Sequence, residues 1–203
     1  MTIDDFKASL KSCETDSSLV DLCRRTVLHG TPAVFINRED EFYSFRKRVA
    51  DKFDVSFHEV YIVGSAKLGF SPLKDYKLFD LDSDIDVSIV SRDLFDRFLD
   101  EILKFQMEYQ AARKSITGRE IRLYHRFLEY IALGWMRPDK LPLSFQVDDL
   151  KKDWFDFFGS LSYGKSEVGN YKVNAGVFKD YKHLEVYTLS GIKSAQSVLS
   201  VEM

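Results

Sequence analysis

The feature that most constrains the fold is a short apolar run that ends in a Gly-Ser dipeptide and is followed by a second apolar run with two acids. The first run, EVYIV at 59–63, predicts a strand. The second, DSDIDVSIV at 82–90, predicts another strand in which Asp84 and Asp86 lie two residues apart. Side chains at i and i+2 of a strand point to one face. The two acids are therefore expected to project together, while the aliphatic side chains between and after them face the opposite layer.

Helical periodicity surrounds these two strands. Apolar residues at steps of three or four predict two short helices in the first thirty residues and further helices over 40–53, 92–114, 118–134, 148–162 and 179–199. A third strand is predicted over YKVNAGVF, 171–178, and the prolines of WMRPDKLP, 135–142, indicate a surface excursion. This order predicts an α/β chain of the α+β type, with a short mixed sheet covered by helices.

The length and composition of the chain favour one domain. A chain of 203 residues, 45% of them hydrophobic, is long enough to bury a substantial core. The expected parts of this single domain are a helical N-terminal part (1–55), a motif core (56–92), a second helical part (93–165) and a strand with a C-terminal helix (166–203). The net charge of −3 gives no global signature of a nucleic-acid-binding protein.

The N-terminus and the cysteines indicate the compartment. MTIDDFKASLKSC carries acids where a signal peptide needs a basic region, and no 18 apolar residues occur in succession. We therefore expect a cytoplasmic protein with no membrane partner. Cys13 and Cys23 are expected to be reduced packing residues, and the four histidines lack the spacing of a zinc site.

The Gly-Ser turn is suited to bind phosphate. Gly64 lets the backbone approach a bulky anion, and Ser65 adds a hydroxyl and an amide as donors. At the start of a short helix, such a turn can cradle a phosphate group. Lys67 is placed either to touch a phosphate or, more simply, to be an exposed lysine.

The two acids are suited to bind a cation. Two carboxylates this close repel each other unless a cation lies between them. Magnesium is the natural occupant, because it takes a few carboxylate oxygens and completes its octahedron with water and substrate phosphates. The acidic stretch DLDSDID, 80–86, is also compatible with a solvated sheet edge that discourages strand pairing.

Together, GSAKLG at 64–69 and SDIDVSIV at 83–90 resemble the signature of the DNA polymerase beta-like nucleotidyltransferase superfamily, in which a Gly-Ser turn precedes an Asp-x-Asp on the next strand. The resemblance covers only residues 64 to 90. It implies a nucleotidyltransferase domain in which two magnesium ions serve transfer of a nucleoside monophosphate from a nucleoside triphosphate (NTP). Gly64 and Ser65 would hold the triphosphate, and Asp84 and Asp86 would bind the metals and act in catalysis.

The resemblance leaves the acceptor open. Members of the superfamily modify proteins, RNA ends or small molecules, or make nucleotide messengers, including in bacterial defence and toxin-antitoxin settings. A third carboxylate usually comes from a later strand, but 171–178 contains no acid. Asn174 is the nearest polar substitute there, and an amide binds magnesium more weakly than a carboxylate does. The alternative function is accordingly a catalytically degenerate nucleotidyltransferase-like module that binds a ligand or partner and regulates.

Other acids are candidates for the third position. Asp148 and Asp149 follow LSFQV, 143–147, which is compatible with a short strand, and Asp180 begins the last helix.

Basic and aromatic residues elsewhere suggest further contacts. Tyr76 lies in the segment between the turn and the acids, where a base could stack on it or where it could belong to a solvated loop. FRKR at 45–48 and KDYK at 179–182 combine charge with aromatics as a nucleic-acid surface does, but each is more simply the wet face of a helix.

Overall fold

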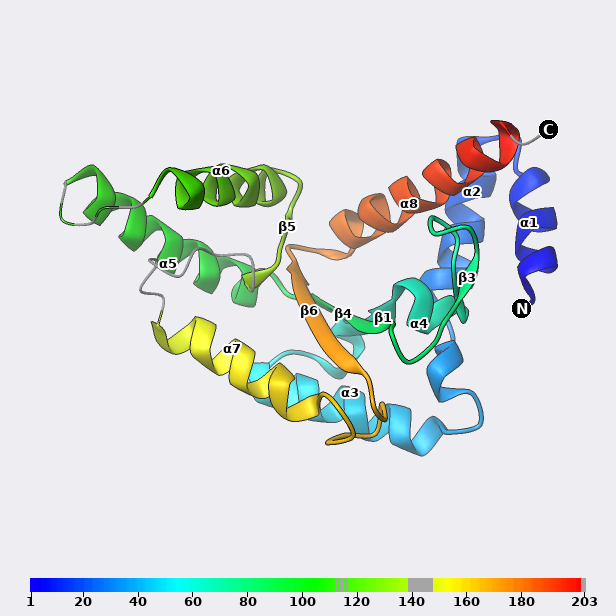
Figure 1. Ribbon diagram of the computed structural model, residues 1–203, viewed down its shortest axis with the longest axis horizontal. Helices are drawn as coiled ribbons and strands as arrows, with labels where there is room; N and C mark the ends of the chain where they lie inside the picture. Colours follow the sequence, from blue (N-terminus) through cyan, green and yellow to red (C-terminus); the bar gives the residue numbers. More distant parts are fainter. Residues whose placement is uncertain (112, 114, 116, 139–147, 202–203) are drawn as a thin grey trace.

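The computed structural model describes all residues except 112, 114, 116, 139–147 and 202–203. Within the described residues, eight α-helices surround a four-stranded mixed sheet and a separate two-stranded sheet (Figure 1). The helices are α1 (Ile3–Lys11), α2 (Asp16–Cys23), α3 (Glu39–Phe53), α4 (Gly64–Leu68), α5 (Arg92–Gln110), α6 (Gly118–Ala132), α7 (Asp148–Leu161) and α8 (Tyr181–Val201). The strands are β1 (Val60–Val63), β2 (Phe70–Ser71), β3 (Lys77–Leu78), β4 (Asp84–Val90), β5 (Trp135–Met136) and β6 (Lys172–Phe178). The short turns η1 (Arg24–Leu28), η2 (Ala33–Phe35) and η3 (Phe57–Glu59) complete the described elements.

The central sheet has the strand order β1-β4-β6-β5. β1 and β4 pair antiparallel, with Val63 opposite Asp86, whereas β4 and β6 pair parallel, with Asp86 opposite Asn174. β5 pairs antiparallel with the other side of β6. The predicted mixed sheet with helices around it is confirmed, and the two predicted strands that flank the Gly-Ser turn are neighbours in it.

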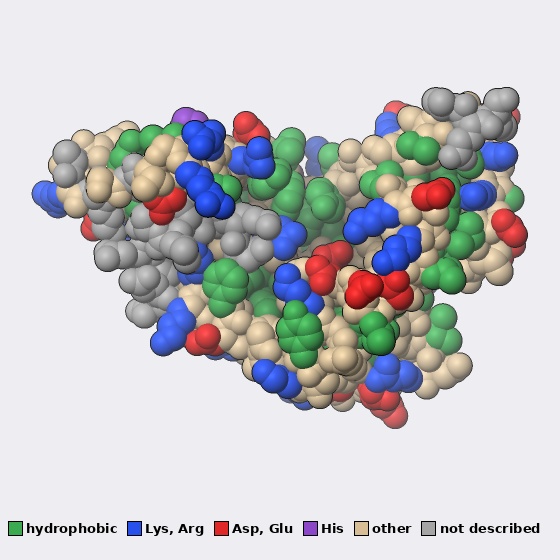
Figure 2. Space-filling view, in the orientation of Figure 1, with side chains coloured by type: hydrophobic (Ala, Val, Ile, Leu, Met, Phe, Trp, Pro, Cys, Tyr) green, Lys and Arg blue, Asp and Glu red, His purple; other side chains and the backbone are tan. Residues whose placement is uncertain are grey.

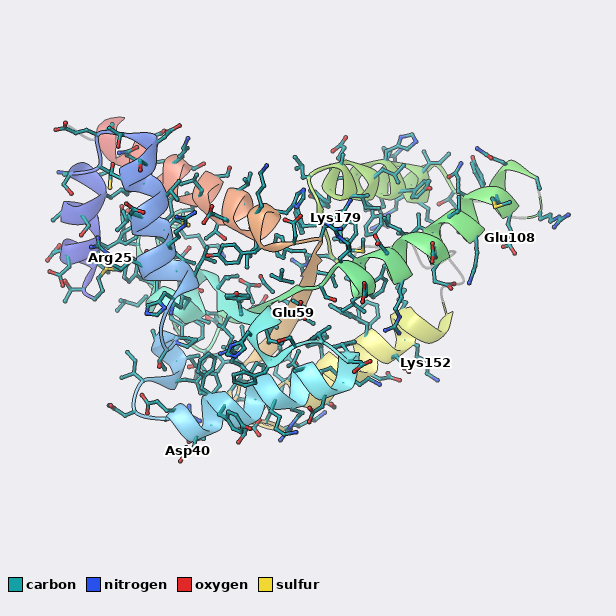
Figure 3. The ribbon with its side chains drawn as sticks, turned by 180° about the vertical axis from the view of Figure 1, so that it is seen from behind. Arg25, Asp40, Glu59, Glu108, Lys152 and Lys179 are labelled. Atoms are coloured by element: carbon teal, nitrogen blue, oxygen red, sulfur yellow. The ribbon has the colours of Figure 1, made fainter. Side chains whose placement is uncertain are left out.

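One face of the sheet carries the larger hydrophobic core. Aliphatic side chains of β4, such as Ile85 and Ile89, are fully buried against α3, α5 and α7. Phe53 of α3 packs its ring on Trp154 of α7, with centroids 4.9 Å apart. From behind, α3 begins next to Asp40 and runs below the sheet (Figure 3). Because side chains alternate along a strand, Asp84 and Asp86 of β4 face the opposite side of the sheet from this core.

A second core holds the N-terminal and C-terminal helices together. Phe6 and Leu10 of α1 and Leu184 of α8 are fully buried in it, along with Leu22 and Cys23 of α2. Both described cysteines are free thiols, as expected. The cluster places α8 next to the central sheet, where it contacts β4 and β6.

Side-chain caps explain the starts of four helices, α1, α2, α5 and α6. Thr2 caps α1 by accepting from the Asp5 N–H at 3.1 Å, while Asp5 accepts from the Thr2 N–H in return. Thr117 and Glu120 form the same reciprocal cap on α6. Among the described helices, none is long and apolar enough to cross a membrane.

The structure differs from the sequence-based expectation in two segments. The excursion expected at 135–142 begins with β5, and Met136 is fully buried, because the short strand covers the far edge of β6. The segment between the turn and the acids folds into the β2–β3 hairpin, in which Phe70 pairs with Leu78. The possible strand 143–147 lies outside the described residues.

Candidate functional site

A cavity of about 510 Å³ lies between the acid-bearing face of the sheet and α8. Its lining comes from β1, α4, β4, β6 and α8, so segments far apart in the sequence meet there. Figure 2 shows the molecule hollowed near its middle, with hydrophobic side chains in the hollow and acidic and basic side chains gathered beside it. A cavity of this volume falls within the range that small-molecule ligands occupy.

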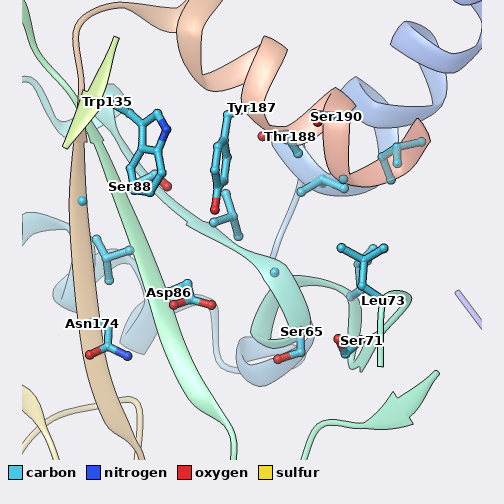
Figure 4. Close-up of a pocket in the computed structure, with 18 of the residues that line it drawn as sticks. Ser65, Ser71, Leu73, Asp86, Ser88, Trp135, Asn174, Tyr187, Thr188 and Ser190 are labelled. Atoms are coloured by element: carbon cyan, nitrogen blue, oxygen red, sulfur yellow. The ribbon is translucent and has the colours of Figure 1, made fainter. Parts of the chain in front are cut away.

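The Gly-Ser turn forms one wall of this cavity. Gly64 follows directly from β1 with φ +67°, a left-handed conformation that favours glycine, and it begins α4. A Cβ added at Gly64 would lie 3.1 Å from Oδ2 of Asp86. The absence of a side chain at Gly64 therefore lets the turn approach the carboxylate, and Ser65 lies beside it in the same wall (Figure 4).

Asp84 and Asp86 project from β4 toward the open side of the sheet, as the strand period predicts. Asp86 lines the cavity, and burial raises the pKa of its carboxyl from the usual 3.8 to about 6. The positive charge of Arg137 opposes this rise, while the negative charge of Asp84 adds to it. A carboxyl that burial makes difficult to ionise, as Asp86 is, gains from a cation beside it.

The neighbouring strand supplies an amide at the level of the acids. Asn174 of β6 is in register with Asp86, and its Nδ2 donates to Oδ2 of Asp84 at 2.7 Å. Asp86 and Asn174 project to the same side of the sheet (Figure 4). The position on β6 from which a third carboxylate would reach the pair is thus occupied by an amide, which also orients Asp84.

The structure adds three cavity residues that sequence reasoning missed. Trp135 and Tyr187 face each other with ring centroids 5.0 Å apart, and the Tyr187 hydroxyl points toward Asp86 (Figure 4). Burial and the charge of Asp86 raise the pKa of that hydroxyl. Arg137 lines the same cavity. No local pattern marks these residues, because β5 and α8 reach the site only through the tertiary fold.

The expectation that Lys67 is exposed was wrong. Lys67 is 7% exposed, does not line this cavity, and donates from Nζ to the carbonyl oxygens of His29 and Gly30. Residues two positions apart lie about 200° from each other around an α-helix, so Lys67 points away from Ser65 and lines a separate cavity. The candidate phosphate contacts in the main cavity are therefore Gly64 and Ser65.

The other suggested third acids do not join the pair in the described structure. Asp180 accepts from Nδ1 of His183 at 2.7 Å and does not line the cavity. Asp148 and Asp149 begin α7, and their side chains lie outside the described residues. Tyr76 packs against the rings of Phe6 and Phe70 and is not part of the cavity lining.

The residues of the cavity fit a magnesium ion. Carboxylate and amide oxygens are hard ligands of the kind that magnesium prefers. Because Gly64 has no side chain, Oδ2 of Asp86 is left uncovered next to the turn, and Asp84 and Asp86 would hold the ion. In the described part of the chain, no three His, Cys, Asp or Glu side chains are grouped to hold a metal, and the polar side chain opposite Asp86 on β6 is the Asn174 amide, which turns its nitrogen toward Asp84.

Comparison with known proteins identifies no relative: no family model, curated protein or solved structure matches this chain.

Proposed function

We propose that the protein is a magnesium-dependent nucleotidyltransferase, which moves a nucleoside monophosphate from an NTP to an acceptor of protein, RNA or small-molecule class. In this reaction an acceptor hydroxyl oxygen bonds to the α-phosphorus, and the bond from that phosphorus to the bridging oxygen breaks. Pyrophosphate leaves, and the hydroxyl proton passes to solvent. The motif resemblance at residues 64 to 90 suggests this class of reaction.

The observation that carries the proposal is the close approach between the Gly-Ser turn and Asp86, one of the two acids, inside one cavity. The Gly64 backbone and the Asp86 carboxylate approach closely enough that a methyl group at Gly64 would touch Oδ2. A phosphate group bound by the turn would therefore lie next to the carboxylate pair. A solvated sheet edge does not explain this arrangement, because Asp86 faces a cavity and is partly buried.

Asp84 and Asp86 would hold the metal in this proposal. Magnesium, when bound, would neutralise charge on the phosphate oxygens and lower the pKa of the attacking hydroxyl. The Nδ2 donor of Asn174 keeps the Asp84 carboxylate in one orientation and so reduces the entropy that the site loses on binding. Lys172, opposite Asp84 on β6, adds positive charge that acts on Asp86.

The remaining walls suit the phosphates and the base of a nucleotide. Ser65 offers its hydroxyl and backbone N–H to a phosphate group, and Arg137 adds a cation in the same cavity. Trp135 and Tyr187 present aromatic surface on which a base can stack. The cavity thus offers acidic, cationic and aromatic groups in the combination that a magnesium-nucleotide complex requires.

A second candidate function is a nucleotide-binding module without turnover. The observation that favours it is Asn174 at the position opposite Asp86, where a third carboxylate would otherwise complete the metal site. With only two carboxylates, the site would bind one magnesium-nucleotide complex but hold a second metal weakly.

The test is calorimetric binding of ATP, GTP, CTP and UTP in the presence and absence of magnesium. The wild type is compared with the double variant Asp84→Asn/Asp86→Asn and with Asp82→Asn, in which an exposed acid of the same segment receives the same substitution. We expect magnesium-dependent binding in the wild type and in Asp82→Asn, and its loss in the double variant.

Incubation with labelled nucleotide and candidate protein, RNA and small-molecule acceptors then separates the two functions. Label transfer that the double variant lacks supports the enzyme, and magnesium-dependent binding without transfer supports the module. A folded wild type that binds no triphosphate contradicts both.

A further inference from the structure

A second cavity, of about 240 Å³, lies beside β1 at the edge of the central sheet. We call it the β1 cavity, and it is lined by segments of η1, α3, η3, β1 and α4, with His29, Gly30, Arg46, His58, Tyr61 and Lys67 among its residues. From behind, Arg25 marks η1 and Glu59 marks the end of η3, two of the elements that border this cavity (Figure 3). The proposed transfer reaction uses none of these residues.

Lys67 brings a buried positive charge into the β1 cavity. Its side chain is 7% exposed, and Nζ donates to the carbonyl oxygen of Gly30 at 2.6 Å and to that of His29. These two bonds satisfy N–H groups, and no carboxylate of the described residues forms an ion pair with the amine. Burial lowers the pKa of the amine to about 8. A buried ammonium without a counterion is costly unless an anion can reach it.

Arg46 adds a second cation with unused donors. Its Nη2 donates to the Phe57 carbonyl at 2.9 Å, and the guanidinium lies over the Phe57 ring, 4.2 Å from the centroid. Its Nε is buried and has no hydrogen-bond partner. The sequence suggested that FRKR forms the wet face of α3, but Arg46 is drawn inward, against the sheet edge. A buried donor without a partner costs free energy that a bound acceptor would recover.

Acidic groups do not balance these charges within the cavity. None of the described residues that line it is an aspartate or glutamate, and His29 and His58 are its other ionisable nitrogen groups. Glu59, at the end of η3, accepts from the Ser56 N–H at 2.7 Å and is not part of the lining. The cavity therefore presents two cationic side chains and two histidines without a counter-charge.

The backbone next to the cavity is also unusual. η1 is a π-helical turn, a form that is rare and occurs frequently at functional sites. It ends at Leu28, directly before His29 and Gly30, whose two carbonyl groups hold Lys67. From these observations we infer that the β1 cavity is a binding site for the phosphate group of a small phosphorylated ligand.

The dimensions of the site support a phosphate group in preference to a whole nucleotide. The volume of about 240 Å³ is below the usual range for drug-sized ligands. An adjoining hollow of about 440 Å³ shares Leu28, His29 and Tyr61 with it and is lined in addition by Asp21, Arg24, Arg25 and Tyr181. A phosphomonoester could place its phosphate between Arg46 and Lys67 and extend its organic part into this hollow.

The test measures binding of inorganic phosphate and of ribose 5-phosphate by calorimetry at constant ionic strength. The variants are Arg46→Gln and Lys67→Met. The control is Arg48→Gln, which removes another guanidinium of α3. The Arg48 guanidinium pairs with Glu167 and does not line the β1 cavity. Loss of one charged hydrogen-bonding partner is expected to weaken phosphate affinity roughly ten- to a hundredfold in the two variants and to leave the control unchanged. If Lys67→Met fails to fold, Arg46→Gln alone decides the test.

The two probes separate the possible sources of the phosphate group. Tighter binding of ribose 5-phosphate than of inorganic phosphate supports a phosphorylated ligand that uses the adjoining hollow, whereas equal or weaker binding reassigns the site to free phosphate. The variant Asp84→Asn/Asp86→Asn is expected to bind both probes as the wild type does, so failure of the nucleotidyltransferase proposal does not affect this result. A folded wild type without saturable phosphate binding, or unchanged affinity in Arg46→Gln, would overturn the inference.

Discussion

The substitution Gly64→Ala tests whether the Gly-Ser turn and the acids form one site. Gly64 has φ +67°, and an alanine Cβ there would lie 3.1 Å from Oδ2 of Asp86, so the carboxylate would have to move by a few tenths of an ångström. The variant therefore combines two effects, a backbone strain and a displacement of Asp86. A matched substitution is needed to separate them.

Gly164→Ala is the matched control substitution, because it introduces the backbone strain without a displaced carboxylate. Gly164 has φ +77°, and a Cβ at this position would have no heavy atom within 4 Å. An L-residue in the left-handed region costs about 1–2 kcal/mol, so both variants should lose this free energy of unfolding and about 2–8 °C in Tm. Only Gly64→Ala should also weaken binding of magnesium-ATP, by about tenfold, because small misplacements of a metal-binding group are costly.

Thermal denaturation and calorimetric titration with magnesium-ATP measure the two effects on the same samples. Wild-type affinity in a folded Gly64→Ala variant would refute the argument that the turn and Asp86 share one ligand. Equal loss of affinity in both variants would show that general destabilisation, and not the position of Asp86, limits binding.

Three further predictions concern the acids and the core. Because the pKa of Asp86 is raised from 3.8 to about 6, the folded state binds this proton more tightly than the unfolded state does. The contribution of Asp86 to stability, about 3 kcal/mol, should be fully present below pH 3.8 and fall to zero as the pH rises through about 6. Asp86→Asn should abolish this fall in denaturation curves recorded with a chelator, and an unchanged pH profile would contradict the assignment. In the absence of magnesium, Asn174→Asp should lower Tm, because Asp84 loses its hydrogen-bond donor at 2.7 Å and faces a second negative charge instead. Added magnesium should restore the Tm of this variant. A Tm insensitive to magnesium would argue against a metal at this position. Phe53→Ala should cost about 3–5 kcal/mol in urea denaturation, since this ring is 6% exposed and packs against Trp154, and a loss below 1 kcal/mol would refute the packing argument.

Lys67 and Arg46 illustrate why burial was the hardest property to predict. Both residues occupy segments whose local pattern is amphipathic or turn-like, where a basic residue usually faces solvent. Lys67 is buried because the chain after η1 returns to cover α4, and Arg46 is drawn inward by the Phe57 ring and carbonyl. These contacts join residues 11 to 38 positions apart, so no short window of sequence contains them.

Asn174, which occupies the position of the expected third carboxylate, also has some properties that local sequence predicts and others that depend on the tertiary fold. The sequence placed Asn174 on the correct strand and on its polar face, because strand alternation is local. Its partnership with Asp84 depends on the register between β4 and β6, which about 80 intervening residues separate in the chain. Trp135 and Tyr187 could not be assigned to the site at all, since β5 and α8 carry no motif.

The sequence by itself determined the helices, the three main strands, the Gly-Ser turn and the shared face of Asp84 and Asp86. Each of these follows from a periodicity of two or 3.6 residues, or from a preference of one or two residues for a turn or cap. Only the tertiary structure decided that the turn faces Asp86 across one cavity, that Asn174 orients Asp84, and that Lys67 is buried in a second cavity. The physical reason is that strand pairing and helix docking are selected by the packing of the whole core, whereas periodicity and capping act within a few residues.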